Sequence, residues 1–169
     1  LFNKLGIDTN NEEEMYKNYI KSQELYFNEE SIRFLKTHSC FVNRKDFQFT
    51  DKHNTLGVIY IVRDPKKILF SLANDFKQTN QQSSEIILTK QYLGKDTPNH
   101  CLTYLSSWKD HYNSWKTFNK YNRYCLIKYE DLVHDTEKVF LEVLKFISRM
   151  AKVHFSIEKE KLQNTLKTC

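Results

Sequence analysis

Glycine and proline are scarce in this sequence, with three glycines and two prolines among 169 residues. The glycines, Gly6, Gly57 and Gly94, are isolated, and no GxxxxGK segment or other Gly-rich loop occurs. Such loops let backbone N–H groups approach a phosphate closely, so three glycines are few for a complete α/β nucleotide-binding domain. The sequence also begins at Leu1 and ends at Cys169 without an evident stop signal. We therefore expect an internal fragment of a longer protein.

Long apolar runs and paired cysteines are absent as well. No apolar run reaches the roughly 20 residues that span a membrane, and no signal peptide is visible. The four cysteines form no CxxC pair and show no metal-ligand spacing with the six histidines. We therefore expect no membrane partner, no bound metal, and reduced thiols in a cytoplasmic protein. The cysteines are Cys40, Cys101, Cys125 and Cys169.

Aromatic residues, in contrast, are abundant: the chain has twelve Phe, ten Tyr and two Trp. They supply enough apolar surface for one folded domain of this length, which argues against disorder. The net charge of +5 is modest, and the lysines are scattered, mostly on polar faces of the expected helices. A nucleic-acid-binding module gathers its positive charge on one surface. The pattern therefore favours solvated lysines and no nucleic-acid partner.

The stretch GVIYIVRDPKKILFSLANDF, residues 57–76, combines a strand with a helix. Its first part is a continuous run of β-branched and aromatic side chains, as in a strand buried on both faces. Asp64 and Pro65 are typical of a helix N-cap and first turn, and apolar residues then recur at helical spacing. Anionic ligands bind at such strand-to-helix junctions of open α/β folds. Arg63 ends this strand, and Ser71 can face the same crevice.

The remaining patterns predict alternating helices and strands. The order of these elements implies a parallel sheet flanked by helices. We expect helices over 11–28, over 98–120, after a cap at Asp135 and over about 156–168, strands over 31–36 and 123–129, a polar loop over 43–55, and a loop over 77–97 with a short helix around 85–92.

Three stretches in this order and spacing resemble one family. They are LKTHS at 35–39, YIVRDPKKILFSL at 60–72 and KYEDLVHDTEKVFLEVLKFI at 128–147. They look like the sulfotransferases that use 3′-phosphoadenosine 5′-phosphosulfate (PAPS), and most like the cytosolic-type branch. The resemblance covers nearly all of residues 31–150. It implies an α/β, P-loop-NTPase-like parallel sheet flanked by helices, present here as a single domain fragment, 1–169, truncated at both ends.

The resemblance assigns three residues to the cofactor site. Arg63 and Ser71 match the pair that binds the 3′-phosphate of PAPS. The chemistry agrees, because a guanidinium fork binds a phosphate dianion bidentately and a hydroxyl adds a neutral donor. Tyr129 matches the tyrosine that lies near the adenine. The structural alternatives are an ion pair between Arg63 and Asp64 or a neighbouring helix, a polar helix face for the serine, and an ordinary strand-end position for the tyrosine.

The resemblance also assigns the catalytic groups. His38 matches the general base, and imidazole suits that task because its pKa lies near neutrality. Lys36, two residues earlier, projects to the same side of an extended chain. It can stabilise the charge shared between the transferring sulfuryl group and the leaving oxygen. The structural alternative for His38 is a hydrogen-bonded turn residue.

A fourth stretch, SWKDHYNSW at 107–115, lies where the family has a Trp- and His-bearing helix. For Trp108, Asp110 and His111 the sequence leaves two roles open. Either they line the acceptor pocket, or they pack the helix against its neighbours.

The implied reaction moves a sulfuryl group from PAPS to a hydroxyl or amine of a small-molecule acceptor. A histidine base, where glycan-directed branches use a glutamate, favours the small acceptor; the sequence leaves its identity and the oligomeric state open. The family's phosphosulfate loop and its basic closing segment have no counterpart in 1–169, so we expect the fragment alone to be inactive. The alternatives are a P-loop-type nucleotide-dependent kinase, which requires a Walker-type lysine loop and Mg²⁺-binding acids, and a non-catalytic basic nucleic-acid-binding module.

Overall fold

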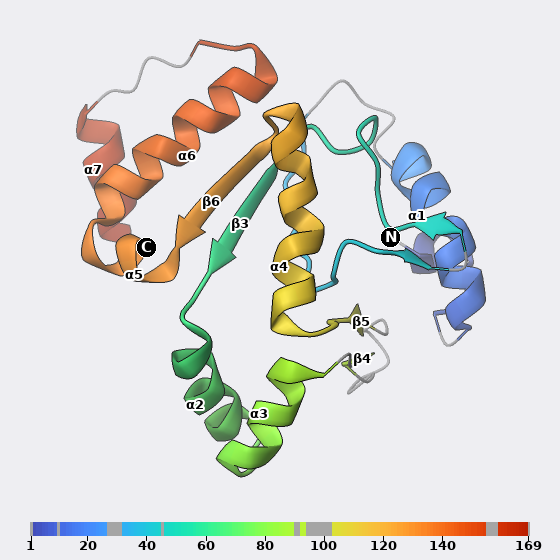
Figure 1. Ribbon diagram of the computed structural model, residues 1–169. Helices are drawn as coiled ribbons and strands as arrows, with labels where there is room; N and C mark the ends of the chain where they lie inside the picture. Colours follow the sequence, from blue (N-terminus) through green and yellow to red (C-terminus); the bar gives the residue numbers. More distant parts are fainter. Residues whose placement is uncertain are drawn as a thin grey trace. The chain divides into compact units, whose positions relative to one another are not determined.

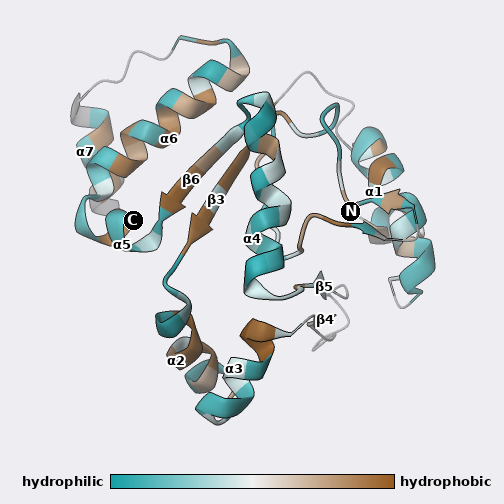
Figure 2. Ribbon diagram, viewed as in Figure 1, coloured by the Kyte–Doolittle hydropathy of each residue, from teal (hydrophilic) through white to brown (hydrophobic). Residues whose placement is uncertain are grey.

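The two most hydrophobic strand-like runs of the chain pair with each other. In the computed structural model, β3 (Val58–Val62) and β6 (Tyr124–Lys128) are parallel neighbours, with Val58 opposite Tyr124 and Val62 opposite Lys128. Figure 1 shows the two strands side by side, and both are largely hydrophobic in Figure 2. The predicted parallel pairing of these runs is confirmed.

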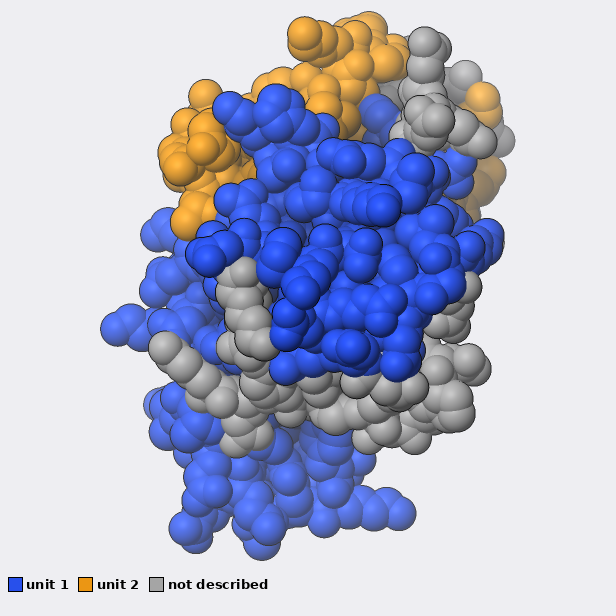
Figure 3. Space-filling model, turned by 90° about the vertical axis from the view of Figure 1, so that its right-hand side faces the viewer, with its two compact units in different colours: residues 1–55, 65–116 blue, residues 56–64, 117–169 orange. Residues whose placement is uncertain are grey.

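The chain divides into two compact units, each built from two segments of the sequence (Figure 3). Unit 1 comprises residues 1–55 and 65–116, and unit 2 comprises residues 56–64 and 117–169. The strand β3 therefore belongs to unit 2, whereas the helix that follows it in sequence belongs to unit 1. The structure describes residues 2–9, 11–26, 32–44, 46–89, 92–93, 103–154 and 159–168.

Unit 2 is the β3–β6 pair with its covering helices. The amphipathic helix α6 (Thr136–Ala151) runs alongside β6 (Figure 1). Its N-terminus is capped as predicted, because the Asp135 side chain accepts the Lys138 N–H at 3.1 Å. The C-terminus ends at Lys152, whose φ of 54° lies in the left-handed region that stops a helix. The further elements of unit 2 are η2 (Thr117–Tyr121), α5 (Tyr129–His134), α6 (Thr136–Ala151) and α7 (Lys159–Thr168).

Gly57 lets α6 approach the start of β3. A Cβ atom at this position would lie 2.9 Å from Phe146 Cζ and 3.1 Å from Met150 Cγ. Real Cβ atoms do not tolerate the first distance, so a side chain here would displace the phenylalanine ring. Phe146 is buried in the core of unit 2 together with Val58 and Ile127.

Unit 1 has a largely aromatic core. The ring of Phe49 lies 5.0 Å from that of Tyr19 and 6.0 Å from that of Trp115, both in edge-on geometry. Trp115 also packs on Phe41, with ring centres 5.2 Å apart. Aromatic pairs at these distances add to the stability that burial provides. The elements of unit 1 are η1 (Phe2–Leu5), α1 (Glu12–Tyr26), β1 (Asn43–Arg44), β2 (Phe47–Gln48), α2 (Pro65–Asp75), α3 (Asn80–Leu88), β4 (Tyr92–Leu93), β5 (Thr103–Tyr104) and α4 (Trp108–Lys116).

The prediction of a strand over 31–36 is wrong for residues 32–36, and residue 31 lies outside the described residues. A strand needs a hydrogen-bonded neighbour, and no described segment pairs with this one. The side chains of Phe34 and Leu35 are 68% and 65% exposed. The apolar composition that suggested a strand therefore has no sheet to join within the described residues.

Three other boundaries also differ from the predictions. The loop expected over 43–55 contains the short antiparallel hairpin of β1 and β2. The short helix expected around 85–92 begins earlier, because Thr79 and Gln82 form a reciprocal capping box before α3. The helix expected from residue 98 begins only at Trp108: residues 98–102 lie outside the described residues, and β5 follows them. Ser106, with φ at 60°, breaks the helical path just before α4.

The other predicted elements are formed. α1, α2, β6 and α7 all lie inside their predicted ranges, although residues 27, 28 and 156–158 lie outside the described residues. Within the part of the chain that is described, no helix combines the length and the apolarity needed to cross a membrane.

Replacing Gly57 with valine should destabilise unit 2. The added methyl groups must displace Phe146 and Met150, and such overpacking costs about 1–3 kcal/mol of unfolding free energy. Urea unfolding of Gly57→Val and the unmodified protein measures this loss. In a Phe146→Leu background, which opens space at the same place, the loss should be smaller. Equal losses in the two backgrounds would mean that the glycine is not needed for this contact.

Candidate active site

The carboxyl ends of β3 and β6 bring Arg63 and Tyr129 together. Val62 lies opposite Lys128 in the parallel register, so the next residue of each chain reaches the same edge of the sheet. The guanidinium carbon of Arg63 lies 4.5 Å from the centre of the Tyr129 ring, in a cation–π contact. The predicted placement of both residues at one sheet edge is confirmed.

The guanidinium of Arg63 is held by this aromatic face and not by a carboxylate. Among the described residues, Arg63 forms no ion pair, and its buried Nε has no hydrogen-bond partner. The alternative of an ion pair with Asp64 is therefore not what the structure contains. Contact with a ring face leaves the in-plane N–H groups of a guanidinium able to bind an anion. A buried donor without a partner fits a phosphate oxygen, which would satisfy it.

Glu130 links the two strand ends on the backbone side. The Asp64 N–H donates to Glu130 Oε1 at 3.4 Å, and Glu130 lies in the first turn of α5, where the helix dipole favours an acid. This gives the glutamate a structural role. In the described ranges, no group of three or more His, Cys, Asp and Glu side chains lies together as a metal site requires.

Ser71 lies on α2 in a half-buried position. It belongs to unit 1, whereas Arg63 belongs to unit 2, and the structure describes each unit by itself. The meeting of these two side chains at one phosphate therefore stays a prediction. The same holds for any placement of Lys36 and His38 relative to Arg63.

Lys36 and His38 lie in a segment of unit 1 that forms no helix or strand, and both side chains are exposed. Burial changes abruptly after them, because Ser39 and Cys40 are only 9% and 1% exposed. Among the described residues the imidazole of His38 has no hydrogen-bond partner; only its backbone carbonyl is bonded. No hydrogen bond to a described residue therefore holds the ring, and the side chain is exposed.

Helix α4 holds the backbone of this segment. His111 Nε2 lies 3.2 Å from the carbonyl oxygen of His38. Four residues later on the same helix face, Trp115 Nε1 donates to the carbonyl oxygen of Ser39 at 2.9 Å. The candidate base and the residue after it are thus both bonded through their carbonyl groups.

Two further hydrogen bonds hold the backbone of the next two residues, Cys40 and Phe41. The Phe41 N–H donates to Ser114 Oγ at 3.0 Å, and the Cys40 N–H donates to the Tyr104 carbonyl oxygen at 2.7 Å. The Cys40 thiol also lies 3.2 Å from Ser114 Oγ. Residues 38–41 therefore have at least one backbone bond each, although they belong to no helix or strand.

His111 makes its contact as a neutral ring. Burial lowers the pKa of His111, the hydrogen bond to the His38 carbonyl raises it, and the charge of the His38 ring lowers it again. The net pKa lies below the ordinary value, so the imidazole is uncharged at neutral pH. A carbonyl oxygen can only accept, so the proton of the neutral ring lies on Nε2.

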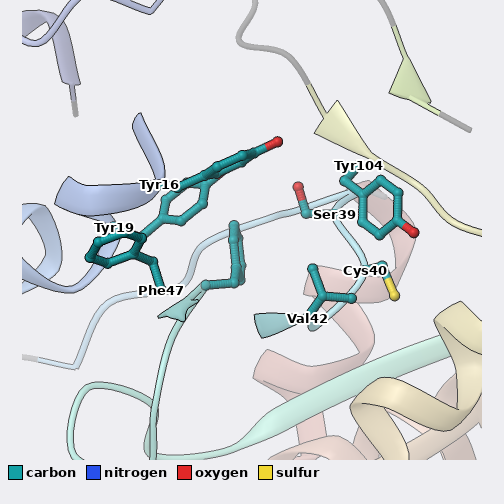
Figure 4. A pocket seen from close by; sticks show the side chains of 8 residues that line it. Tyr16, Tyr19, Ser39, Cys40, Val42, Phe47 and Tyr104 are labelled. Carbon is teal, nitrogen blue, oxygen red and sulfur yellow. The ribbon is translucent and has the colours of Figure 1, made fainter. Parts of the chain in front are cut away.

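A small cavity lies behind the same segment (Figure 4). Aromatic side chains surround it, with Tyr16 and Tyr19 from α1 on one side and Ser39, Cys40 and Tyr104 on the other. Its volume is about 10 Å³, enough for no more than about one water molecule. It is a gap in the packing of unit 1 and is too small for an acceptor.

The sequence left the roles of Trp108, Asp110 and His111 open, and the structure describes a packing role for two of them. Trp108 stacks on Tyr112, with ring planes 8° apart and centres separated by 5.9 Å. His111 binds the backbone of the candidate base. Ser114 and Trp115 were missed as site residues, although their spacing from His111, i+3 and i+4, marks one helix face and could have grouped them.

Comparison with known proteins shows which family the chain belongs to. A family model described as "Sulfotransferase domain" matches residues 5–169, and no curated protein matches the chain. Among solved structures, the crystal structure of mouse sulfotransferase SULT7A1 complexed with PAP is similar, with 22% sequence identity and a TM-score of 0.48. The similarity covers 70% of this chain and 40% of the mouse chain, so this chain spans less than half of that protein's length. Because the family match extends over nearly all of its residues, the chain belongs to the sulfotransferase domain family.

Proposed function

We propose that the whole protein transfers a sulfuryl group from PAPS to a hydroxyl or amine of a small-molecule acceptor. The observation that carries the proposal is the Arg63–Tyr129 pair, in which a guanidinium at a sheet edge has a buried donor that no described residue satisfies. Membership of the sulfotransferase domain family supports the same activity. Neither observation favours a kinase or a nucleic-acid-binding module.

In this proposal three side chains hold the nucleotide. Bound PAPS supplies an activated sulfuryl group attached to a phosphate leaving group. Arg63 binds the 3′-phosphate with its in-plane N–H groups, and Ser71 adds a hydroxyl donor. Tyr129, which keeps the guanidinium in place, also lies beside the adenine. The selectivity for a 3′-phosphorylated nucleotide then rests mainly on the arginine.

Two side chains act on the acceptor. His38 accepts the acceptor's proton as its oxygen or nitrogen bonds to sulfur, while the bond from sulfur to the phosphate oxygen breaks. Lys36 places a positive charge near the oxygens that gain negative charge during the transfer. Little covalent work is required beyond in-line positioning, as in phosphoryl transfer. The products are the sulfated acceptor and 3′-phosphoadenosine 5′-phosphate.

We also propose that the protein works in the cytoplasm on small acceptors. Cys125 is a free thiol, which suits a reducing compartment. The histidine at position 38, where glycan-directed branches use a glutamate, supports a small acceptor.

Arg63→Ala should weaken binding of 3′-phosphoadenosine 5′-phosphate far more than binding of adenosine 5′-phosphate. A charge-assisted contact of this kind contributes roughly 1.5–3 kcal/mol, or about ten- to a hundredfold in affinity. Titration calorimetry on the whole protein measures both nucleotides. Arg63→Lys is the matched control, because lysine keeps the positive charge but cannot form the two parallel hydrogen bonds of a guanidinium. Its loss of affinity for 3′-phosphoadenosine 5′-phosphate should lie between that of the unmodified protein and that of Arg63→Ala. Equal losses for the two nucleotides would show that Arg63 does not recognise the 3′-phosphate.

His38→Gln should leave nucleotide binding nearly intact and lower the single-turnover rate by roughly 10²-fold or more. The rate of the unmodified enzyme should rise with pH through an apparent pKa near that of a histidine, and the variant should lose this rise. Lys36→Ala should lower the rate but keep the rise, because it removes a fixed charge and not the base. A folded, nucleotide-binding His38→Gln variant with an undiminished rate would rule out the general base.

A further inference from the structure

The segment that carries His38 depends on side chains of α4 for its position. Residues 38–41 lie outside any helix or strand, so no ladder of backbone bonds fixes them. Their backbone groups bond instead to side chains of α4, among them those of His111, Ser114 and Trp115, and to the Tyr104 carbonyl. Within the segment, the Ser39 N–H also donates to Thr37 Oγ1 at 3.0 Å. The imidazole itself has no partner among the described residues, so the placement of the ring follows from the placement of its backbone.

A general base works only within a narrow range of positions. Misplacement by about 1 Å can lower a rate by on the order of 10²-fold, and base side chains generally need supporting contacts to stay in place. For His38 those contacts lie on the backbone. The contact that reaches His38 itself is the one from His111 Nε2 to its carbonyl oxygen.

We propose that α4 positions the general base through its backbone, with His111 as the positioning residue that acts directly on His38. This inference rests on the proposed function, because it takes His38 as the base. Trp115 and Ser114 hold the two residues around Cys40, and Trp115 anchors the arrangement in the aromatic core.

The chemistry of His111 suits this role better than that of a second base. Its Nε2 must carry a proton to donate to a carbonyl, so that nitrogen cannot also accept one from a substrate. A neutral ring adds no positive charge beside His38, whereas a cationic donor here would lower the basicity of the His38 imidazole. His111 therefore supports the backbone of the base without weakening the base.

The test compares His111→Gln with His111→Met in the whole protein. Glutamine and methionine have similar length and volume, so both fill the half-buried site, but only glutamine can donate to the His38 carbonyl. Single-turnover transfer from radiolabelled PAPS is measured with a simple phenol, a simple alcohol and a simple amine as probes. We expect His111→Met to lower the rate on the order of tenfold or more, with unchanged affinity for 3′-phosphoadenosine 5′-phosphate. His111→Gln should recover most of the rate.

The pH profile separates positioning from proton transfer. His111→Met should keep the rise of rate with pH, because His38 remains the base. Loss of that rise would make His111 the base and overturn the inference. Asn113→Ala, an exposed neighbour on the same helix, is the control and should match the unmodified protein.

A double-mutant cycle gives the decisive outcome. If His111 acts only through His38, then adding His111→Met to His38→Gln should lower the rate no further. A merely structural role would instead lower the melting temperature of both His111 variants alike and leave the rate of the folded protein unchanged. Equal rates for the His111→Met, His111→Gln and unmodified proteins would overturn the inference and leave the proposed function standing. If the unmodified protein transfers no sulfuryl group to any probe, the proposed function fails, and the inference fails with it.

Discussion

The parallel register of β3 and β6 is the constraint on which the candidate nucleotide site depends. A slip of one residue would move Arg63 by about 3.3 Å along the strand and turn alternate side chains to the opposite face. The cation–π contact with Tyr129 exists only in the observed register. At the other end of β3, Phe146 packs where Gly57 has no side chain. Packing at the start of the strand thus supports the register that brings Arg63 and Tyr129 together at its end.

In unit 1 the candidate base lies on a segment without regular structure, so tertiary contacts must fix its position. Trp115 connects that segment with the core: its ring packs on Phe41 and on Phe49, and its N–H donates to the Ser39 carbonyl. Removing the indole would therefore disturb folding and positioning together. His111 lies at the more exposed end of the same helix face. Replacing it should therefore disturb the positioning of the segment more than the folding of unit 1.

The sequence predicted correctly those elements that depend on neighbouring residues in the chain. The run from Val58 to Val62, the Asp135 cap and the family stretches correctly predicted β3, β6, α2, α6 and the strand-end positions of Arg63 and Tyr129. The strand at 31–36 failed in its described part because a strand depends on a partner elsewhere in the chain. The start of α4 was misplaced because a positive φ at Ser106 cannot be inferred from helical spacing. The hydrogen bonds between α4 and residues 38–41 are tertiary contacts. The sequence indicated only that His111, Ser114 and Trp115 share one helix face.

The two candidate sites share one principle of construction. Under the proposed function, each ligand-facing group is held through a part of itself that the ligand does not use. Tyr129 contacts the face of the Arg63 guanidinium and leaves its in-plane N–H groups for a phosphate. His111 contacts the carbonyl of His38 and leaves its imidazole for a proton. Holding either side chain by its own hydrogen-bonding atoms would fix it more tightly, but a ligand would then have to break those bonds before it could bind. Under the proposed function, this arrangement keeps both groups oriented and chemically available before the substrates arrive.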